Sequence, residues 1–293
     1  MKTPARRTAW SAHAALLPLG LTVLVAYVAG ILWTVRISFT NSKMLPKSDW
    51  VGLTQYELLF ASDRWATDMV NVALFGVTFI SGAMVLGFLL AVFIDQKIRF
   101  EGVFRTIYLY SYSLSFVASG VIWQWLCNPL LGIQQSLRSW GWENARFDWI
   151  TSQDMAIYCV TLAVLWHSAG LVMAILLAGL RGVDDELWKA AQIEGIPRWR
   201  YYISIVLPQL GPSLGTCLVL LSVAVIKVFD AVVAMTNGGP GDATDVPTKF
   251  IMDNLFERQN IGLASAASTT MLLTVLVIVA PLLYARSRAG KTA

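Results

Sequence analysis

Long apolar stretches alternate with short polar segments along the chain. Six stretches of mostly apolar residues stand out: 14–35, 70–94, 106–126, 156–180, 211–235 and 264–284. Because about 20 apolar residues in a helix cross the hydrocarbon core of a bilayer, each stretch predicts one transmembrane helix. The first is longer than the apolar part of a secretory signal and no small-residue cleavage site follows it, so we expect it to stay as an anchor. The predicted fold is an all-α integral membrane protein with six transmembrane helices.

Composition supports this assignment and removes several functional classes. Apolar residues make up 56% of the 293 residues and charged residues only 14%, whereas a soluble domain averages about 25% charged residues. The net charge of +4 is spread thinly between apolar runs, which argues against nucleic-acid binding. Cys127, Cys159 and Cys217 show no spacing typical of a disulfide framework or a metal site. The chain also lacks a phosphate-binding loop of the G-x-x-x-x-G-K-[ST] type, so we expect ATP hydrolysis elsewhere.

Lysine and arginine are distributed unequally between the loops on the two sides of the predicted spans. With six spans both termini lie on one side, which carries 13 of these residues: Lys2, Arg6, Arg7, Lys97, Arg99, Arg105, Arg181, Lys189, Arg198, Arg200, Arg286, Arg288 and Lys291. The other side carries seven: Lys43, Lys47, Arg64, Arg138, Arg146, Lys249 and Arg258. Because short cytoplasmic loops are enriched in basic residues, both termini are predicted to be cytoplasmic.

The fourth predicted loop contains the pattern of a short polar helix. Asp184 stands where an N-cap is expected, acidic residues follow it, and Gly195 stands where a helix ends. This helix is too short and too charged to span a membrane, and Ala190 and Ala191 would let another backbone approach closely. The segment fits either a knob presented to a cytoplasmic partner or an interfacial helix on the lipid headgroups.

The spacing within and after this helix resembles the cytoplasmic signature of membrane subunits of bacterial ABC importers. That signature is E-A-A, three residues, G and, eleven residues later, a pair such as L-P; here it is 189–195 with Leu207 and Pro208. The T-x-G-G-P turn of the sugar-importing branch is matched by 236–240. Lys189 stands where the family has Glu, which inverts one charge at the expected contact with the ATPase. The resemblance assigns ATPase coupling to Asp184, Trp188, Lys189, Ala190, Ala191, Glu194, Gly195, Leu207 and Pro208.

The resemblance also implies an architecture and a set of partners. It implies the ABC importer type I permease fold, with an N-terminus and first helix in 1–36 and a five-helix core in 37–293 that contains the coupling loop 181–207. The implied partners are a second related permease subunit, an ATPase dimer that binds ATP and Mg, an extracytoplasmic solute-binding protein and membrane lipid. We expect no catalytic residue, metal, cofactor or nucleic acid in this chain itself, and a multi-pass location in the bacterial cytoplasmic membrane.

Polar residues within the predicted spans are candidates for a substrate path. Lys227 and Asp230 are three residues apart, so on a continuous helix they would share a face and line the path, although Lys227 could instead extend to the membrane surface. His167 faces a cavity or is a neutral core histidine. The full candidate set is Asn71, Gln124, Trp166, His167, Ser168, Ser222, Lys227 and Asp230, of which Asn71, Gln124 and Ser222 also suit helix contacts.

The predicted function is therefore transport of a solute by a subunit of an ATP-driven importer. Cation-poor, aromatic-rich spans suit a neutral mono- or oligosaccharide, and 194–199 resembles glucose- or mannose-type importers. One alternative is an ABC permease for another small polar solute, such as glycerol phosphate. A secondary carrier would show repeats and broken helices at matching positions. An intramembrane enzyme would need a paired nucleophile and base or a metal-ligand cluster, for which the spans offer too few residues.

Overall fold

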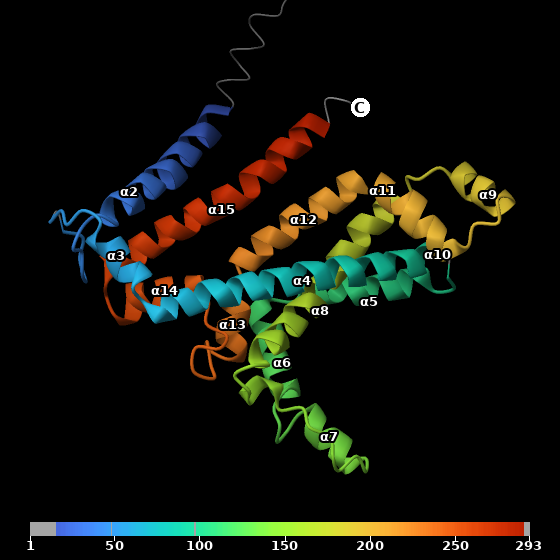
Figure 1. The fold of residues 1–293 in the computed structure, drawn as a ribbon, viewed down its shortest axis with the longest axis horizontal. Helices are drawn as coiled ribbons and strands as arrows, with labels where there is room; N and C mark the ends of the chain where they lie inside the picture. Colours follow the sequence, from blue (N-terminus) through green and yellow to red (C-terminus); the bar gives the residue numbers. More distant parts are fainter. Residues whose placement is uncertain (1–15, 48, 97, 290–293) are drawn as a thin grey trace, which may run out of the picture. The chain divides into compact units, whose positions relative to one another are not determined.

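The computed structural model describes residues 16–47, 49–96 and 98–289, and this part of the chain is helical apart from loops and isolated bridges (Figure 1). It divides into two compact units. Unit 1 contains the chain up to Ser62 together with Phe250–Leu276, and unit 2 contains Asp63–Lys249 together with the chain from Val277. Predictions for the terminal basic residues Lys2, Arg6, Arg7 and Lys291, and for Lys97, fall outside the described residues.

Unit 1 is built on two long helices joined through a polar turn region. The backbone N–H of Gly262 donates to the carbonyl of Ser42 at 2.8 Å, and a Cβ built at Gly262 would lie 2.5 Å from the carbonyl oxygen of Thr40. This close approach of two backbones requires a glycine. The elements are a helix over Leu16–Ile37 that includes η1 (Val23–Val28) and α2 (Ala29–Ile37), then α3 (Thr54–Phe60), η4 (Asp253–Glu257) and the part of α15 (Ile261–Ala289) up to Leu276.

Unit 2 holds the larger core, in which α4 (Asp63–Asp95) packs along α8 (Ala156–Leu180). Phe75 and Phe79 of α4 are fully buried and stack at 5.3 Å between ring centroids. A Cβ built at Gly87 would lie 2.4 Å from Cγ1 of Val172, so the two helices can meet closely only at a residue without a side chain.

Of the remaining elements of unit 2, α5 and α12 run alongside this pair of helices, and α7 extends away from it (Figure 1). Helix α5 packs on α8, and α6 packs on α13. The elements are α5 (Glu101–Ser113), α6 (Phe116–Leu126), α7 (Ile133–Ser139), η2 (Trp149–Thr151), α9 (Asp185–Ile193), α10 (Arg198–Tyr201), η3 (Tyr202–Val206), α11 (Leu207–Gln209), α12 (Gly211–Ile226) and α13 (Phe229–Met235), and α14 (Pro247–Met252) continues into unit 1.

Three of the predicted spans are present as single helices. The described residues contain three helices that are long and apolar enough to cross a membrane, Leu16–Ile37, Asp63–Asp95 and Ala156–Leu180. They correspond to the predicted spans 14–35, 70–94 and 156–180, of which residues 14 and 15 lie outside the described part. The three cysteines are free and buried, as small core residues.

The predicted span 106–126 is two helices rather than one. Helix α5 ends at Ser113, Leu114 and Ser115 are extended with ψ of 151° and 147°, and α6 begins at Phe116. The hydroxyl of Ser115 accepts a hydrogen bond from the backbone N–H of Ala118 at 3.1 Å, which caps the new helix. The break has a local cause that a count of apolar residues does not register.

The predicted span 211–235 is also interrupted. Helix α12 ends at Ile226, with Lys227 as its C-cap, and α13 begins at Phe229. At its other end, α12 is bent by 75° from the preceding helical segment Arg198–Gln209. Prolines at 208 and 212 flank this bend, and each lacks the backbone donor of a regular helix. The sixth predicted span, 264–284, falls within α15, whose segment Ile261–Val277 is a shorter apolar helix.

Candidate functional site

The polar helix predicted in the fourth loop is α9, and its start is capped as expected. Asp184 is the N-cap, with an extended backbone at φ −66° and ψ 127°. Its carboxylate accepts a hydrogen bond from the backbone N–H of Glu186 at 2.9 Å. The cap satisfies a backbone donor that the helix leaves free and places negative charge at the positive end of the helix dipole.

The end of α9 is a Schellman motif centred on Gly195. The backbone N–H of Gly195 donates to the carbonyl of Gln192 at 3.1 Å, and that of Ile196 donates to the carbonyl of Ala191 at 2.9 Å. Gly195 has φ +68°, the left-handed region that a side chain strains. The helix therefore ends at this residue, and the chain changes direction before Pro197.

One side of α9 packs against the chain that follows it. The rings of Trp188 and Tyr201 lie 4.9 Å apart between centroids, and the guanidinium carbon of Arg198 lies 5.6 Å from the centroid of the Trp188 ring. Ala191 is buried at 3% exposure and belongs to the main hydrophobic core of unit 2. Of the two alanines predicted to offer a docking surface, Ala191 is used internally and only Ala190 is exposed.

The opposite side of α9 is uncovered. Ile193 is 88% exposed, which is unusual for a large apolar side chain, and Lys189 and Gln192 are exposed beside it. Sequence reasoning did not single out Ile193, because an apolar residue before a helix end is also typical of a C-cap contact. The exposed side of α9 thus combines one apolar and several polar side chains.

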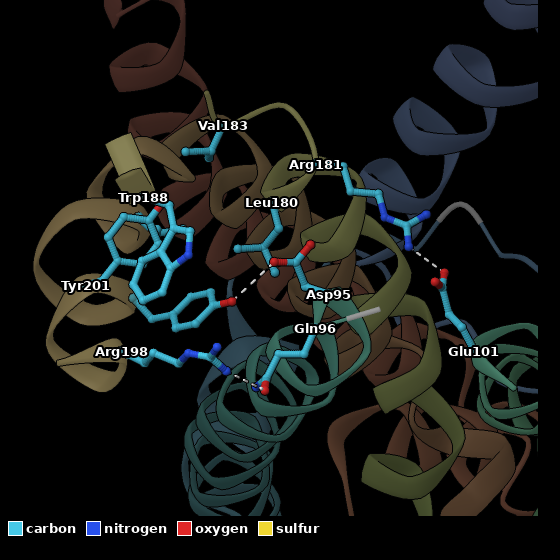
Figure 2. A pocket seen from close by; sticks show the side chains of 11 residues that line it. Asp95, Gln96, Glu101, Leu180, Arg181, Val183, Trp188, Arg198 and Tyr201 are labelled. Atoms are coloured by element: carbon cyan, nitrogen blue, oxygen red, sulfur yellow. Dashed lines mark hydrogen bonds and ion pairs between the residues drawn. The ribbon is translucent and has the colours of Figure 1, made fainter. Parts of the chain in front are cut away.

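A cavity of about 700 Å³ lies between α9, α10 and the ends of α4, α5 and α8 (Figure 2). Polar side chains bridge it. The Tyr202 hydroxyl donates to Oδ2 of Asp95 at 3.3 Å, and Nη1 of Arg198 donates to Oε1 of Gln96 at 3.4 Å. An ion pair joins two further lining residues, Arg181 and Glu101. Side chains of the loop are therefore tied to the ends of α4 and α5, and its backbone continues directly from α8.

Of the candidate path residues, those of α8 gather with α5 and α6. The buried imidazole of His167 lies 4.1 Å from the Phe116 ring between centroids, and its Nδ1 lies 3.3 Å from Oγ of Ser119. Trp166 is 39% exposed and meets Trp123 edge-on at 6.0 Å. Ser168 is buried. His167 is thus a packed, hydrogen-bonded core residue, one of the two alternatives left by the sequence.

The other candidate path residues do not join this group. Lys227 and Asp230 are both exposed, and they stand on either side of the break between α12 and α13. The shared helical face predicted for them is therefore absent, and none of the ion pairs among the described residues joins them. Gln124 is exposed, and the Ser222 hydroxyl donates to the carbonyl of Leu218 at 2.8 Å within its own helix.

Asn71 belongs to a polar cluster that the sequence analysis missed. Its side-chain amide donates to the backbone carbonyls of Asp242 and Asp245 at 2.9 and 3.0 Å. Nε of Arg64 donates to Oδ2 of Asp245 at 2.6 Å, and Asp68 is completely buried nearby. Arg64, Asp68 and Asn71 stand at i, i+4 and i+7 of α4, a spacing that could have revealed the cluster.

Burial and neighbouring charge have opposite effects on the pKa of Asp245 in this cluster. Burial raises the pKa of the Asp245 carboxyl above its ordinary value, and the neighbouring Arg64 guanidinium opposes that shift. Asp245 nevertheless keeps hydrogen bonds to both of its oxygens, because Oδ1 accepts from the backbone N–H of Val246 at 3.0 Å.

Comparison with known proteins identifies the family. Residues 83–289 match the family described as binding-protein-dependent transport system inner membrane component. The chain is 36% identical to a probable ABC transporter permease protein of Pyrococcus horikoshii over 92% of each chain. It is 30% identical to a xylose/arabinose import permease protein of Haloferax volcanii, over 91% of this chain and 84% of that one.

A solved structure has the same fold. The chain superposes with a TM-score of 0.82 and 21% identity on a bacterial ABC transporter involved in the import of the acidic polysaccharide alginate, over 96% of each chain. The family is one of transport subunits, which removes the intramembrane enzyme and the secondary carrier from the alternatives. The chain belongs to the binding-protein-dependent inner membrane components and is a permease subunit of an ABC importer.

Proposed function

We propose that this permease imports a neutral sugar and that the loop 181–207 couples its movement to an ATPase partner. The observation that supports the coupling role is that α9 is packed on one side and exposed on the other. One side is fixed to the protein through Trp188 and Ala191, and the other side leaves Ile193 88% exposed. An apolar side chain held outward on a capped, rigid helix fits the groove of another protein better than water.

The hydrogen bonds across the cavity would transmit a movement of α9 to the membrane helices. A displacement of α9 acts on Arg198 and Tyr202, and these hold Gln96 and Asp95 at the end of α4. Because α4 packs along α8, movement at the loop reaches the core of unit 2. In the proposed motion the transport path closes to one side of the membrane and opens to the other when the ATPase subunits bind and hydrolyse ATP with Mg.

The proposed assembly contains four kinds of protein chain. This subunit pairs with a second, related permease, and the pair binds an ATPase dimer on one side and an extracytoplasmic solute-binding protein on the other. The exposed Lys189 in place of the usual Glu favours two different permease subunits, because each can then present its own charge to the ATPase. We place both termini in the cytoplasm on the basis of the 13 to 7 distribution of Lys and Arg.

The six-span topology also belongs to the proposal. Three spans are single helices, and the pairs α5 with α6 and α12 with α13, together with α15, supply the rest. Within this topology residues 1–36 form the N-terminus and first helix, and 37–293 form the transporting core.

The proposed substrate is a mono- or oligosaccharide of the glucose or mannose type. One similar protein is named for the import of xylose and arabinose, which are neutral sugars, and the solved structure is that of an importer of alginate, an acidic polysaccharide. The aromatic side chains Trp123 and Trp166, which meet edge-on at 6.0 Å, suit the apolar faces of sugar rings. The alternative is another small polar solute, such as glycerol phosphate.

Reconstitution of the purified complex tests this function. The chain is purified with its associated proteins, inserted in liposomes and supplied with ATP and Mg, and uptake of labelled glucose, mannose, xylose and glycerol phosphate is compared. We expect ATP-dependent uptake of a neutral sugar that requires the solute-binding protein. Uptake of glycerol phosphate alone, or purification without an ATPase, would contradict the proposal.

A further inference from the structure

A buried carboxylate without hydrogen bonds lies near the start of α4. Asp68 is 0% exposed, and neither of its oxygens has a hydrogen-bond partner among the described residues. Buried charges are ordinarily paired or hydrogen-bonded, because transfer from water to the protein interior is unfavourable for a charge. Asp68 is therefore a destabilising feature of the conformation in which it is covered.

The charged groups that act on Asp68 come largely from the segment that follows α13. They are Asp245, Asp242 and Lys249, together with Arg64 of α4 itself. We call residues 236–245 the turn segment. Its shape is fixed internally, because the Thr244 hydroxyl donates to the carbonyl of Gly239 at 2.8 Å and lies 2.7 Å from the Thr236 hydroxyl. The turn segment can thus move as one piece.

Two polar contacts attach the turn segment to α4. The Arg64 guanidinium forms an ion pair with Asp245 at 2.6 Å, with 17% and 2% of the two side chains exposed. Asn71 binds the carbonyls of Asp242 and Asp245. Both contacts break together if the turn segment lifts, and Asp68 lies between them on the same face of α4.

We propose that the turn segment is a lid that Arg64 and Asn71 hold closed and that the covered carboxylate of Asp68 drives open. In the closed form Asp68 is buried beside the Asp245 carboxylate, so it must either carry an unpaired buried charge or take up a proton, and both are unfavourable relative to a hydrated carboxylate. The Arg64 guanidinium and the Lys249 ammonium offset part of this cost. In the open form water hydrates both carboxylates. The opposing contributions keep the closed and open forms close in free energy, which allows a small change elsewhere in the transporter to switch the lid.

The test measures lid opening directly, in the assembled complex in lipid nanodiscs. Val246 directly follows the turn segment and is fully buried in the core of unit 2, so a Val246→Cys variant reacts with a small thiol reagent only when the lid opens. The native cysteines are buried and give the background rate in the parent protein. Both faces of a nanodisc are open to the reagent, so the result depends neither on membrane orientation nor on transport.

The charge variants are compared in this Val246→Cys background. Asp68→Asn, which keeps the side-chain shape but cannot ionise, should slow the reaction of the introduced thiol about tenfold, because closing the lid then no longer requires a carboxylate to be buried or protonated. Arg64→Gln should speed it about tenfold, because the ion pair that holds Asp245 to α4 is lost and only Lys249 then offsets the repulsion between the two carboxylates. The matched control is Glu143→Gln, which removes an exposed charge from the loop after α7 that is not among the charges acting on Asp68, and it should change the rate by less than about twofold.

The double variant Arg64→Gln with Asp68→Asn distinguishes lid opening from a general loss of structure. If Asp68 drives opening, the double variant reacts more slowly than Arg64→Gln alone, because the repulsion is gone. If Asp68 only supports the structure, the double variant reacts at least as fast as Arg64→Gln alone, and the proposal is wrong. An unchanged or faster rate in Asp68→Asn alone overturns it as well. Since the readout is independent of transport, neither failure would affect the proposed sugar import.

Discussion

Gly195 determines how the helix α9 ends within the loop 181–207. Its φ of +68° is strained for any residue with a side chain, and no other atom crowds its position, so the backbone alone requires glycine. The Schellman motif and the aspartate cap at Asp184 were both predictable, because capping chemistry is local in sequence.

Replacement of Gly195 by valine should therefore disrupt the loop and uncouple transport. Strain of about 1–3 kcal/mol reduces the population of the observed loop conformation by about 5- to 150-fold. We expect loss of ATP-driven sugar uptake with normal membrane insertion, measured in proteoliposomes and by membrane fractionation. Gly195→Asn is the matched control, because asparagine tolerates this backbone region, and it should retain much of the uptake. Normal uptake by the valine variant would remove the coupling role.

Lys227 and Asp230 show how a break in a helix changes a prediction made for single residues. Their three-residue spacing implies a shared face only on a continuous helix, and α12 ends at Ile226. The apolar pattern continues across the break, so hydropathy alone does not reveal it.

The effects of Lys227→Gln and Asp230→Asn should accordingly be additive. With no ion pair between the two exposed side chains, neither substitution leaves the other charge stranded. We expect the free-energy change of the double variant to equal the sum of the two single changes within about 0.5 kcal/mol, from thermal unfolding of the purified complex. A double variant less impaired than Asp230→Asn alone would show that the two charges interact.

Among the helices, hydropathy located the elements well but not their interruptions. The span 156–180 coincides with α8, whereas 106–126 contains two helices separated at Leu114 and Ser115. The apolar window ignores caps, and only the hydroxyl of Ser115 distinguishes this break locally. The polar cluster of α4 was missed for the opposite reason, because Arg64 and Asp68 lie just outside the apolar window that defined the span.

Ser115→Ala should destabilise the start of α6. Loss of an N-cap hydrogen bond costs about 1 kcal/mol. The Ser113 hydroxyl donates within its own helix, to the carbonyl of Tyr110 at 2.7 Å, and is also exposed, so Ser113→Ala is a matched control with little expected effect. Thermal unfolding of the two purified variants distinguishes them, and equal unfolding temperatures would show that the cap contributes nothing.

For the complete subunit, the proposed function requires α9 to face the cytoplasm and α7 with the turn segment to face outward. Cysteines introduced at Ser139 and Asp242, both exposed, should react with an impermeant thiol reagent in intact cells, and one at Gln192 only after permeabilisation. Thr244 is unsuitable as a reporter because its side chain is fully buried. Reaction of Gln192→Cys in intact cells would reverse the proposed orientation.

Everything proposed for coupling depends on a contact between α9 and an ATPase subunit, which cross-linking can detect. A photo-reactive amino acid is placed at position 193, where the native side chain is 88% exposed, and membranes containing the complete transporter are irradiated. Mass spectrometry then identifies the protein attached to this chain, with position 139 as the control on the other side. We expect a covalent adduct between position 193 and an ATPase subunit and none from position 139. Attachment of position 193 to lipid or to an extracytoplasmic protein, with no ATPase adduct, would contradict the coupling role of α9.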